Sequence, residues 1–212
     1  MRTELDPAES ADMVDDHGFG FYYQPAFNPA VEDLIGRRRQ MGVRTFVNTI
    51  ETLANPAGAS VHLGSFYHLP FAKKVTDTFE RSTHHDLDRV IMFQGMEGYD
   101  DIRPGYTKVA EWNASGGETD FTDYEIETAE YGMDFESEDL EVDDVAADSA
   151  AITEDVLAGE REDHFADAVA LNAAFRIYAR RDVDDLDEGL DVAREAIESG
   201  AAADVLEDLR DF

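Results

Sequence analysis

The chain has 212 residues, 43% of them hydrophobic, which suits a domain with a buried core and excludes a wholly disordered protein. It contains no cysteine, which excludes disulfides, thiolate metal sites and a cysteine nucleophile. Its 49 acidic and 17 basic residues give a formal net charge of -32, which argues against nucleic-acid binding because phosphate neutralisation needs basic patches.

The acidic residues are spread along the whole chain instead of forming a tail. Like charge at this density opposes the compact state at ordinary ionic strength, and molar salt, with a Debye length of about 3 Å, removes most of the repulsion. We therefore expect a salt-adapted protein; the alternative, a nucleic-acid mimic, would cluster its acids. There is no apolar run of membrane-spanning length and no signal-like N-terminus, so we expect a cytoplasmic protein with no membrane partner.

Local signals predict elements in the first sixty residues. Asp6, Pro7 and Glu9 form a capping-box pattern that predicts a helix start, and Gly18 predicts its end. The other predicted elements are a short buried strand over residues 19–23, a helix that starts after Asn28 and runs to about residue 42, and a helix over residues 45–53.

From residue 60 onward, strands alternate with helices. We expect strands at 60–66 and 88–94 around a helix at 70–81, an antiparallel pair at 107–112 and 118–127, and helices at 143–157, 165–178, 190–197 and around 205–209. Gly116-Gly117 could form a phosphate nest, but strands flank it, which favours a hairpin turn. The pattern predicts an α/β fold over residues 1–212 as one domain, with a mixed, mostly parallel sheet flanked by helices and a helical C-terminal third.

Paired acids follow the predicted strand at 88–94. Asp100 and Asp101 lie on a glycine-rich segment beyond that strand, where α/β folds place ligands. Carboxylate oxygens there suit Mg²⁺, which keeps several waters and bridges to substrate phosphates. The alternative is an exposed acidic loop without a ligand.

A basic cluster at residues 37–39 closes the predicted second helix. One interpretation is that these cations complement the helix C-terminus. The other is that one guanidinium binds a substrate carboxylate through two parallel hydrogen bonds.

Several motifs, in this order along the chain, resemble the anthranilate phosphoribosyltransferases, a group within the family 3 glycosyltransferases. They are GFGF at residues 18–21, RRQMGVRT at 38–45, ANP at 54–56, GMEGYDD at 95–101, TKVAE at 107–111 and LNAA at 171–174. The resemblance implies an α/β catalytic domain that couples anthranilate to phosphoribosyl pyrophosphate (PRPP) with Mg²⁺, in a protein that is usually a homodimer. TKVAE and LNAA match signatures to which the resemblance assigns no catalytic role.

The resemblance also implies roles for particular residues. Arg38 matches an arginine that contacts the anthranilate carboxylate, and Asp100 with Asp101 matches an Asp-Glu pair that binds one Mg²⁺. Asn28 stands where a histidine usually lines the acceptor channel. Glu51 and Thr52 stand where the family has Gly-Pro at the acceptor site, and a carboxylate there would repel that of anthranilate.

The family's donor-binding glycine-rich loop and its N-terminal helical domain, the usual dimer contact, have no counterpart in this sequence. We therefore interpret the chain as the acceptor and Mg²⁺ half of such an enzyme, in tryptophan biosynthesis. One alternative is a related pentosyltransferase whose acceptor is another amine. The other is a truncated, non-catalytic relative that acts as a binding module.

Overall fold

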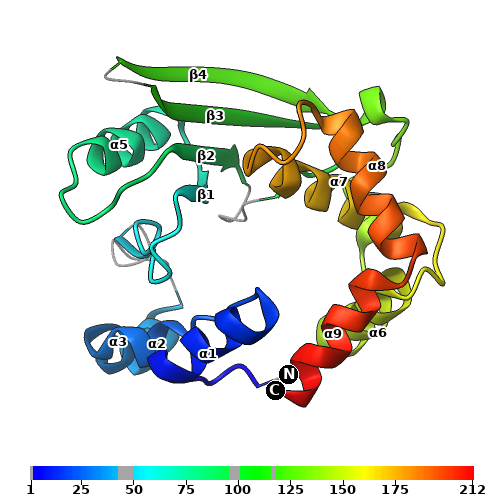
Figure 1. The fold of residues 1–212 in the computed structure, drawn as a ribbon, viewed down its shortest axis with the longest axis horizontal. Coiled ribbons are helices and arrows are strands. Elements are labelled where there is room, and N and C mark those ends of the chain that lie inside the picture. The colour runs from blue at the N-terminus through cyan, green and yellow to red at the C-terminus, as the bar shows by residue number, and fades with distance from the viewer. Residues whose placement is uncertain (1, 43–49, 96–100, 116–117) are drawn as a thin grey trace. The chain divides into compact units, whose positions relative to one another are not determined.

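A computed structural model describes residues 2–42, 50–95, 101–115 and 118–212 (Figure 1). The chain divides into two compact units, residues 1–59 with 204–212, and residues 60–203. Each unit has its own apolar cluster. A single domain over residues 1–212 therefore stays a prediction. Among the described helices, none is long and apolar enough to cross a membrane.

The first unit is helical. Its described elements are α1 (Pro7–His17), α2 (Gln24–Phe27), α3 (Pro29–Met41) and most of α9 (Ala201–Asp211). The start of α1 confirms the predicted capping box, since Asp6 accepts from the Glu9 amide at 3.0 Å and the Glu9 carboxylate accepts from the Asp6 amide at 3.0 Å. Gly18 ends the helix with φ 67°. Leu5, Met13 and Leu209 form the buried cluster of this unit.

The predicted strand over residues 19–23 is wrong. This segment pairs with no strand among the described residues, and Phe19 is 42% exposed. The Phe21 carbonyl accepts a hydrogen bond from the buried Ser10 hydroxyl at 2.9 Å, and the Tyr23 carbonyl accepts from the Ala26 amide at 2.9 Å. An apolar run becomes a strand only beside another strand, and here helices surround it. The predicted helix at 45–53 lies largely outside the described residues.

The second unit is the α/β part of the chain. Its elements are β1 (Val61–Phe66), α5 (Leu69–Glu80), β2 (Arg89–Gln94), β3 (Tyr106–Ser115), β4 (Glu118–Glu127), the 3₁₀ turns η1 (Thr128–Tyr131) and η2 (Ser137–Leu140), α6 (Val145–Leu157), α7 (His164–Ala179) and α8 (Leu186–Glu198). These elements confirm the predicted mixed α/β class with its helical C-terminal third.

The four strands lie in the order β1-β2-β3-β4 (Figure 1). β1 and β2 are parallel, whereas β2 with β3 and β3 with β4 are antiparallel. The described sheet thus has fewer parallel pairs than expected. The crossover helix α5 allows the parallel pairing of β1 with β2, whereas the hairpin between β3 and β4 allows antiparallel pairing alone. Ser115 pairs with Glu118, which confirms the predicted hairpin.

Helices cover both faces of the sheet. On one face, Phe79 of α5 packs against the ring of His62 in β1 with 4.7 Å between centroids. On the other face, Phe175 of α7 contacts Phe93 of β2 with 4.8 Å between the ring centroids. This second face carries the main core of the unit.

The buried face of α7 differs in part from the predicted one. The helical spacing of Phe165, Val169, Ala173 and Ile177 predicts an apolar stripe through these residues. In the structure Leu171, Ala174 and Phe175 are at most 1% exposed, whereas Val169 is 36% exposed. The 3.6-residue period is present, but several apolar faces compete in a helix this rich in alanine. The position of the sheet decided which face is buried.

Helices α7 and α8 approach each other closely at Gly189 of α8. A Cβ atom built there would lie 2.7 Å from the Ala174 carbonyl oxygen of α7. Since that atom belongs to the backbone of a packed helix, it has little freedom to move. Glycine at this position therefore sets the spacing of the helix pair.

We predict that Gly189→Ala lowers the free energy of unfolding by about 1–3 kcal/mol, because the added methyl group forces the helices apart. Urea unfolding in molar KCl measures the loss. The matched control is Gly36→Ala in α3, where a Cβ meets nothing within 4 Å; it should leave stability unchanged or raise it by up to about 1 kcal/mol. Equal effects of the two substitutions would contradict the close-packing argument.

Candidate functional site

The acidic segment predicted from the sequence follows β2. Gly95 is buried, residues 96–100 lie outside the described part of the chain, and Asp101 is exposed. The structure therefore places Asp101, whereas Asp100 falls outside the described residues. Among the described residues, no group of three or more His, Asp or Glu side chains is arranged to hold a metal ion.

The backbone immediately after Asp101 is anchored by α7. The Ile102 amide donates to Asn172 Oδ1 at 2.8 Å, and Asn172 Nδ2 donates to the Ile102 carbonyl at 3.0 Å. The Ile102 side chain is itself 4% exposed within the core. Asn172 belongs to the LNAA motif, so the structure gives that motif a contact which no local sequence signal indicated.

Two threonines hold the next residues. The Arg103 amide donates to Thr107 Oγ1 at 3.0 Å, and the Gly105 amide donates to Thr128 Oγ1 at 3.1 Å. Thr107 opens the TKVAE motif and is fully buried. Both motifs without an assigned role thus fasten the segment that follows Asp101.

The Asp101 carboxylate fits a hard divalent cation only where other groups supply the remaining ligands. An exposed carboxylate beyond a parallel strand offers oxygen ligands of the kind that Mg²⁺ prefers. Mg²⁺ is commonly held by one or two carboxylates, with waters and substrate phosphates completing the shell. The absence of an acidic cage among the described residues is compatible with that mode.

The residues predicted to bind the acceptor lie in the helical unit. Asn28 precedes α3 and accepts from the Val31 amide at 3.4 Å, and Arg38 lies near the other end of the same helix. The side chain of Arg38 is outside the described part of the structure. Glu51 and Thr52 are half-buried, at the end of a helical turn before Asn55. The structure thus places Asn28 and Arg38 at opposite ends of one helix.

A buried ion pair joins the sheet to the end of α7. Arg89 of β2 and Glu111 of β3 meet with 2.9 Å between Nε and Oε1, and both residues are less than 10% exposed. Arg89 Nη1 also donates to the Tyr178 and Ala179 carbonyls at 2.9 and 3.0 Å. It therefore binds two carbonyl groups of the last turn of α7, where helical carbonyls lose their partners within the helix; the Tyr178 carbonyl also accepts from the Arg181 amide at 2.9 Å.

The Glu111 carboxylate accepts two further hydrogen bonds. Tyr124 of β4 donates its hydroxyl to Oε2 at 3.1 Å, and Asn113 Nδ2 donates to Oε1 at 2.7 Å. Burial, together with the Glu111 charge, raises the pKa of Tyr124 above its ordinary value, so this hydroxyl remains a donor. Arg181, at φ 63°, closes the network through a 2.9 Å bond to Asn113 Oδ1. The hydrogen bonds around the buried pair make this a structural network.

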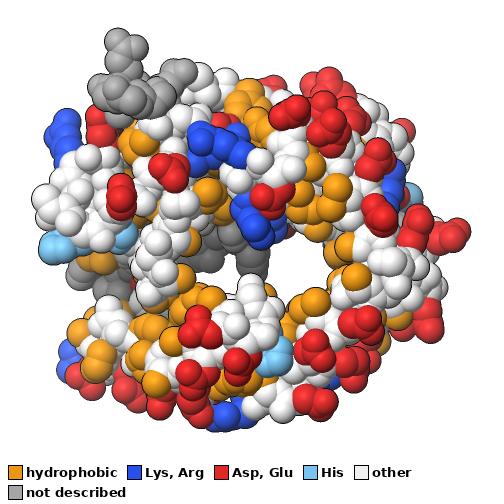
Figure 2. All heavy atoms as spheres, viewed as in Figure 1, with side chains coloured by type: hydrophobic (Ala, Val, Ile, Leu, Met, Phe, Trp, Pro, Cys, Tyr) orange, Lys and Arg blue, Asp and Glu red, His pale blue; other side chains and the backbone are white. Residues whose placement is uncertain are grey.

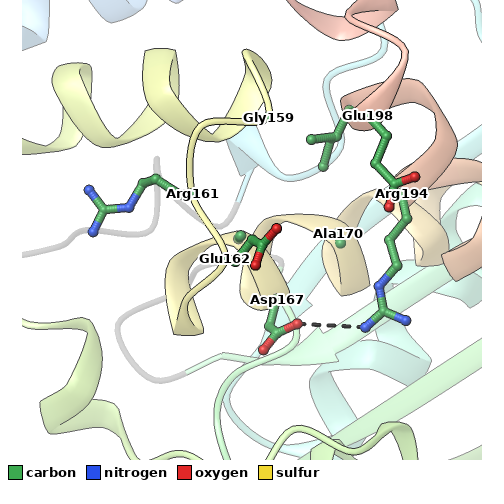
Figure 3. A pocket seen from close by; sticks show the side chains of 9 residues that line it. Gly159, Arg161, Glu162, Asp167, Ala170, Arg194 and Glu198 are labelled. Carbon is green, nitrogen blue, oxygen red and sulfur yellow. Dashed lines mark ion pairs between the residues drawn. The ribbon is translucent and has the colours of Figure 1, made fainter.

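A small cavity of about 230 Å³ lies between the α6–α7 connection, α7 and α8 (Figure 3). Figure 3 shows Arg194 reaching toward Asp167, with which it forms an ion pair at 3.6 Å. Arg161, at the cavity rim, bonds Asp163, the cap of α7, and lowers the pKa of that carboxyl. None of the site residues predicted from the sequence lines this cavity.

Comparisons with known proteins cover nearly the whole chain. Residues 1–203 match the glycosyl transferase family, a/b domain. Anthranilate phosphoribosyltransferase of Persephonella marina is 32% identical over 214 residues, which cover 100% of this chain and 61% of that protein.

The crystal structure of anthranilate phosphoribosyltransferase from Thermus thermophilus superposes with a TM-score of 0.76 and 28% identity, over 98% of this chain and 60% of the other. The Saccharomyces cerevisiae enzyme in complex with PRPP and Mg shares the fold, with a TM-score of 0.76 at 19% identity over 96% of this chain and 57% of the other. The chain thus spans about three-fifths of the length of these proteins.

We predict that Arg89→Met lowers the free energy of unfolding by about 3–5 kcal/mol, because it leaves the Glu111 carboxylate buried without its cation. Urea unfolding in molar KCl, followed by circular dichroism, measures the effect. Lys108→Met is the control, since Lys108 of β3 and Glu125 of β4 form a partly exposed pair at 3.3 Å; it should cost at most about 1 kcal/mol. If the Arg89 variant lost no more stability than the Lys108 variant, the buried pair would not stabilise the junction between the sheet and α7.

Proposed function

The chain belongs to the glycosyl transferase family, and we propose that it carries the acceptor-binding and cation-binding part of an anthranilate phosphoribosyltransferase. The observation that supports the proposal best is 32% identity to such an enzyme along the entire chain. The fold agreement with the Thermus thermophilus enzyme adds independent support. Because the chain spans about 61% of the first relative, transfer from PRPP would also need donor-binding groups beyond those recognised in this sequence.

The proposed acceptor contact is made by Arg38. A guanidinium can bind the anthranilate carboxylate through two parallel hydrogen bonds, which fixes both the position and the orientation of the ring. Orientation of this kind is a major part of what a transferase supplies, because it converts a bimolecular encounter into an aligned reaction. Asn28, Glu51 and Thr52 are the other proposed acceptor-side residues.

The proposed cation ligands are Asp101 and Asp100. A bound Mg²⁺ ion would offset charge on the pyrophosphate group of PRPP. The part of this chain is to present carboxylate oxygens to that ion from an anchored backbone. The bonds from Asn172 to Ile102 and from the Arg103 amide to Thr107 provide the anchoring.

One alternative keeps the transfer reaction and changes the acceptor. Glu51 is half-buried in the acceptor-side unit, and a carboxylate there favours an amine or nitrogenous base over anthranilate. The other alternative is a non-catalytic binding module. Ligand binding separates the three, since a module with no acceptor site binds neither class of compound.

We predict that this chain binds anthranilate and that Arg38→Ala weakens binding about 10- to 100-fold, because a charge-assisted pair of hydrogen bonds is lost. Isothermal titration in molar KCl measures the affinity. Arg37→Ala is the matched control, because Arg37 precedes Arg38 in α3, and it should bind anthranilate as the unchanged chain does.

Equal affinities of the Arg37 and Arg38 variants would overturn the acceptor assignment. Tighter binding of a nucleobase than of anthranilate would favour the related pentosyltransferase. Turnover is then tested by the loss of anthranilate fluorescence with PRPP and Mg²⁺, first with this chain alone. A second sample adds the N-terminal two-fifths of the Persephonella marina relative as a separate polypeptide.

We further propose that the chain is adapted to high salt. Figure 2 shows acidic side chains scattered widely over the visible surface, with few Lys and Arg side chains among them. With a net charge of -32, repulsion among these groups acts against folding until salt screens it. Acids spread in this way, not gathered in one patch, fit general adaptation better than a specific basic partner.

We predict that the urea midpoint of unfolding rises between about 0.1 and 2 M KCl, because the Debye length falls from about 10 Å to less than 3 Å. Urea titrations at matched protein concentration measure the midpoint. A variant with Asp191→Asn and Glu195→Gln, both exposed on α8, should show a smaller rise. A midpoint that stayed constant across this range would contradict salt adaptation.

A further inference from the structure

The side-chain amide of Asn172 binds a single residue of the acidic segment through both of its polar ends. Oδ1 accepts from the Ile102 amide at 2.8 Å and Nδ2 donates to the Ile102 carbonyl at 3.0 Å. The orientation of the amide is determined by further partners, since Nδ2 also donates to the Ala168 carbonyl at 3.0 Å and Oδ1 accepts from Arg176 at 3.3 Å. If the amide were flipped, its NH₂ group would face the Ile102 N–H and its oxygen would face the Ile102 carbonyl, so both hydrogen bonds would be lost.

The bond to the Ile102 amide acts on the peptide group that joins Asp101 to Ile102, and the bond to the Ile102 carbonyl acts on the next peptide group, between Ile102 and Arg103. The Ile102 amide nitrogen belongs to the first of these peptide groups, which is planar, so holding its N–H restricts the Asp101 carbonyl as well. The Ile102 side chain is buried at 4% exposure and packs in the main core of the unit. Asp101 is therefore an exposed acid attached directly to one of the most firmly held backbone positions of this segment.

The anchor comes from a distant part of the chain. Asn172 and Ile102 are 70 positions apart, and Asn172 lies in the middle of α7, whose last turn is bonded to Arg89. A helix held at its end and packed on the sheet is a rigid support for a ligand-bearing loop. A general surface loop has no such support, and ordering it on ligand binding costs conformational entropy.

We propose that Asn172 is a positioning residue that holds the Asp101 carboxylate ready for a hard divalent cation. The proposal rests on the proposed function, in which Asp101 is a cation ligand, and adds the residue that orients it. Groups that orient metal ligands without touching the metal commonly change metal affinity about 10- to 100-fold when removed. A purely structural Asn172 would instead change stability and leave cation affinity at Asp101 unaltered.

The test uses the whole chain in about 1 M KCl, where nonspecific attraction of cations to the acidic surface is screened. Mn²⁺ alone is the probe, and its paramagnetic broadening of the Asp101 and Ile102 amide signals is followed by NMR as Mn²⁺ is added. Asp134, an exposed acid elsewhere in the unit, serves as the internal reference. The samples are the unchanged chain, Asn172→Ala, Asp101→Asn and Ala166→Gly.

Ala166→Gly is the matched control because it lies in the same helix and lowers stability by a helix-propensity effect without touching Ile102. If Asn172→Ala does not fold, Asn172→Ser, which is too short to keep both bonds to Ile102, takes its place. Amide hydrogen exchange at Ile102 should be faster in either Asn172 variant, which reports the loss of the anchor directly.

We expect half-maximal broadening at Asp101 to need about tenfold more Mn²⁺ in the Asn172 variant, and no change in Ala166→Gly. Unchanged Mn²⁺ dependence in the Asn172 variant, or a change no larger than in Ala166→Gly, would overturn the positioning role while leaving Asp101 as a ligand. If Asp101 of the unchanged chain broadened no more than Asp134, or if Asp101→Asn behaved like the unchanged chain, the cation role in the proposed function would fail, and the positioning role with it.

Discussion

The α/β unit depends on one buried ion pair, that of Arg89 and Glu111. A single guanidinium binds a carboxylate of the neighbouring strand and two carbonyl groups at the end of α7, so three elements meet at one side chain. Exposed ion pairs are weakened by salt, but a buried pair is screened much less. In a protein with this surface charge, such a pair is the kind of electrostatic contact that survives molar salt. Its desolvation is offset in part by the further hydrogen bonds that Tyr124 and Asn113 donate to Glu111.

Helix α7 connects that ion pair to the acidic segment that contains Asp101. Its last turn is held by Arg89, its buried face packs on Phe93, and its middle presents Asn172 to Ile102. At Gly189 and Ala174, α8 packs closely against the same helix. Core packing and the placement of Asp101 are therefore not independent, since both follow from where α7 lies on the sheet.

The two units divide the proposed chemistry between them. The helical unit carries Arg38 and the other proposed acceptor residues, and the α/β unit carries Asp101. The acceptor side is defined by residue type, in particular a guanidinium suited to a carboxylate. The cation side is defined by backbone anchoring, because a single exposed carboxylate gains value as a ligand only when its position is restricted. The proposed acceptor site thus depends on the chemistry of one side chain, and the proposed cation site depends on the restriction of the backbone.

Local signals in the sequence determined many of the elements: the capping box at Asp6, the glycine that ends α1, the strands β1 and β2, and the hairpin of β3 and β4 were all predicted correctly. These features depend on residues a few positions apart. The sequence also suggested the family, through motifs in a particular order. It failed for residues 19–23 and for the buried face of α7, because an apolar run acquires its structure from what packs against it. Only the tertiary structure paired Arg89 with Glu111 and Asn172 with Ile102, contacts across 22 and 70 positions. No local pattern encodes such partners, since a buried polar side chain is satisfied by whichever groups the fold brings within hydrogen-bonding distance.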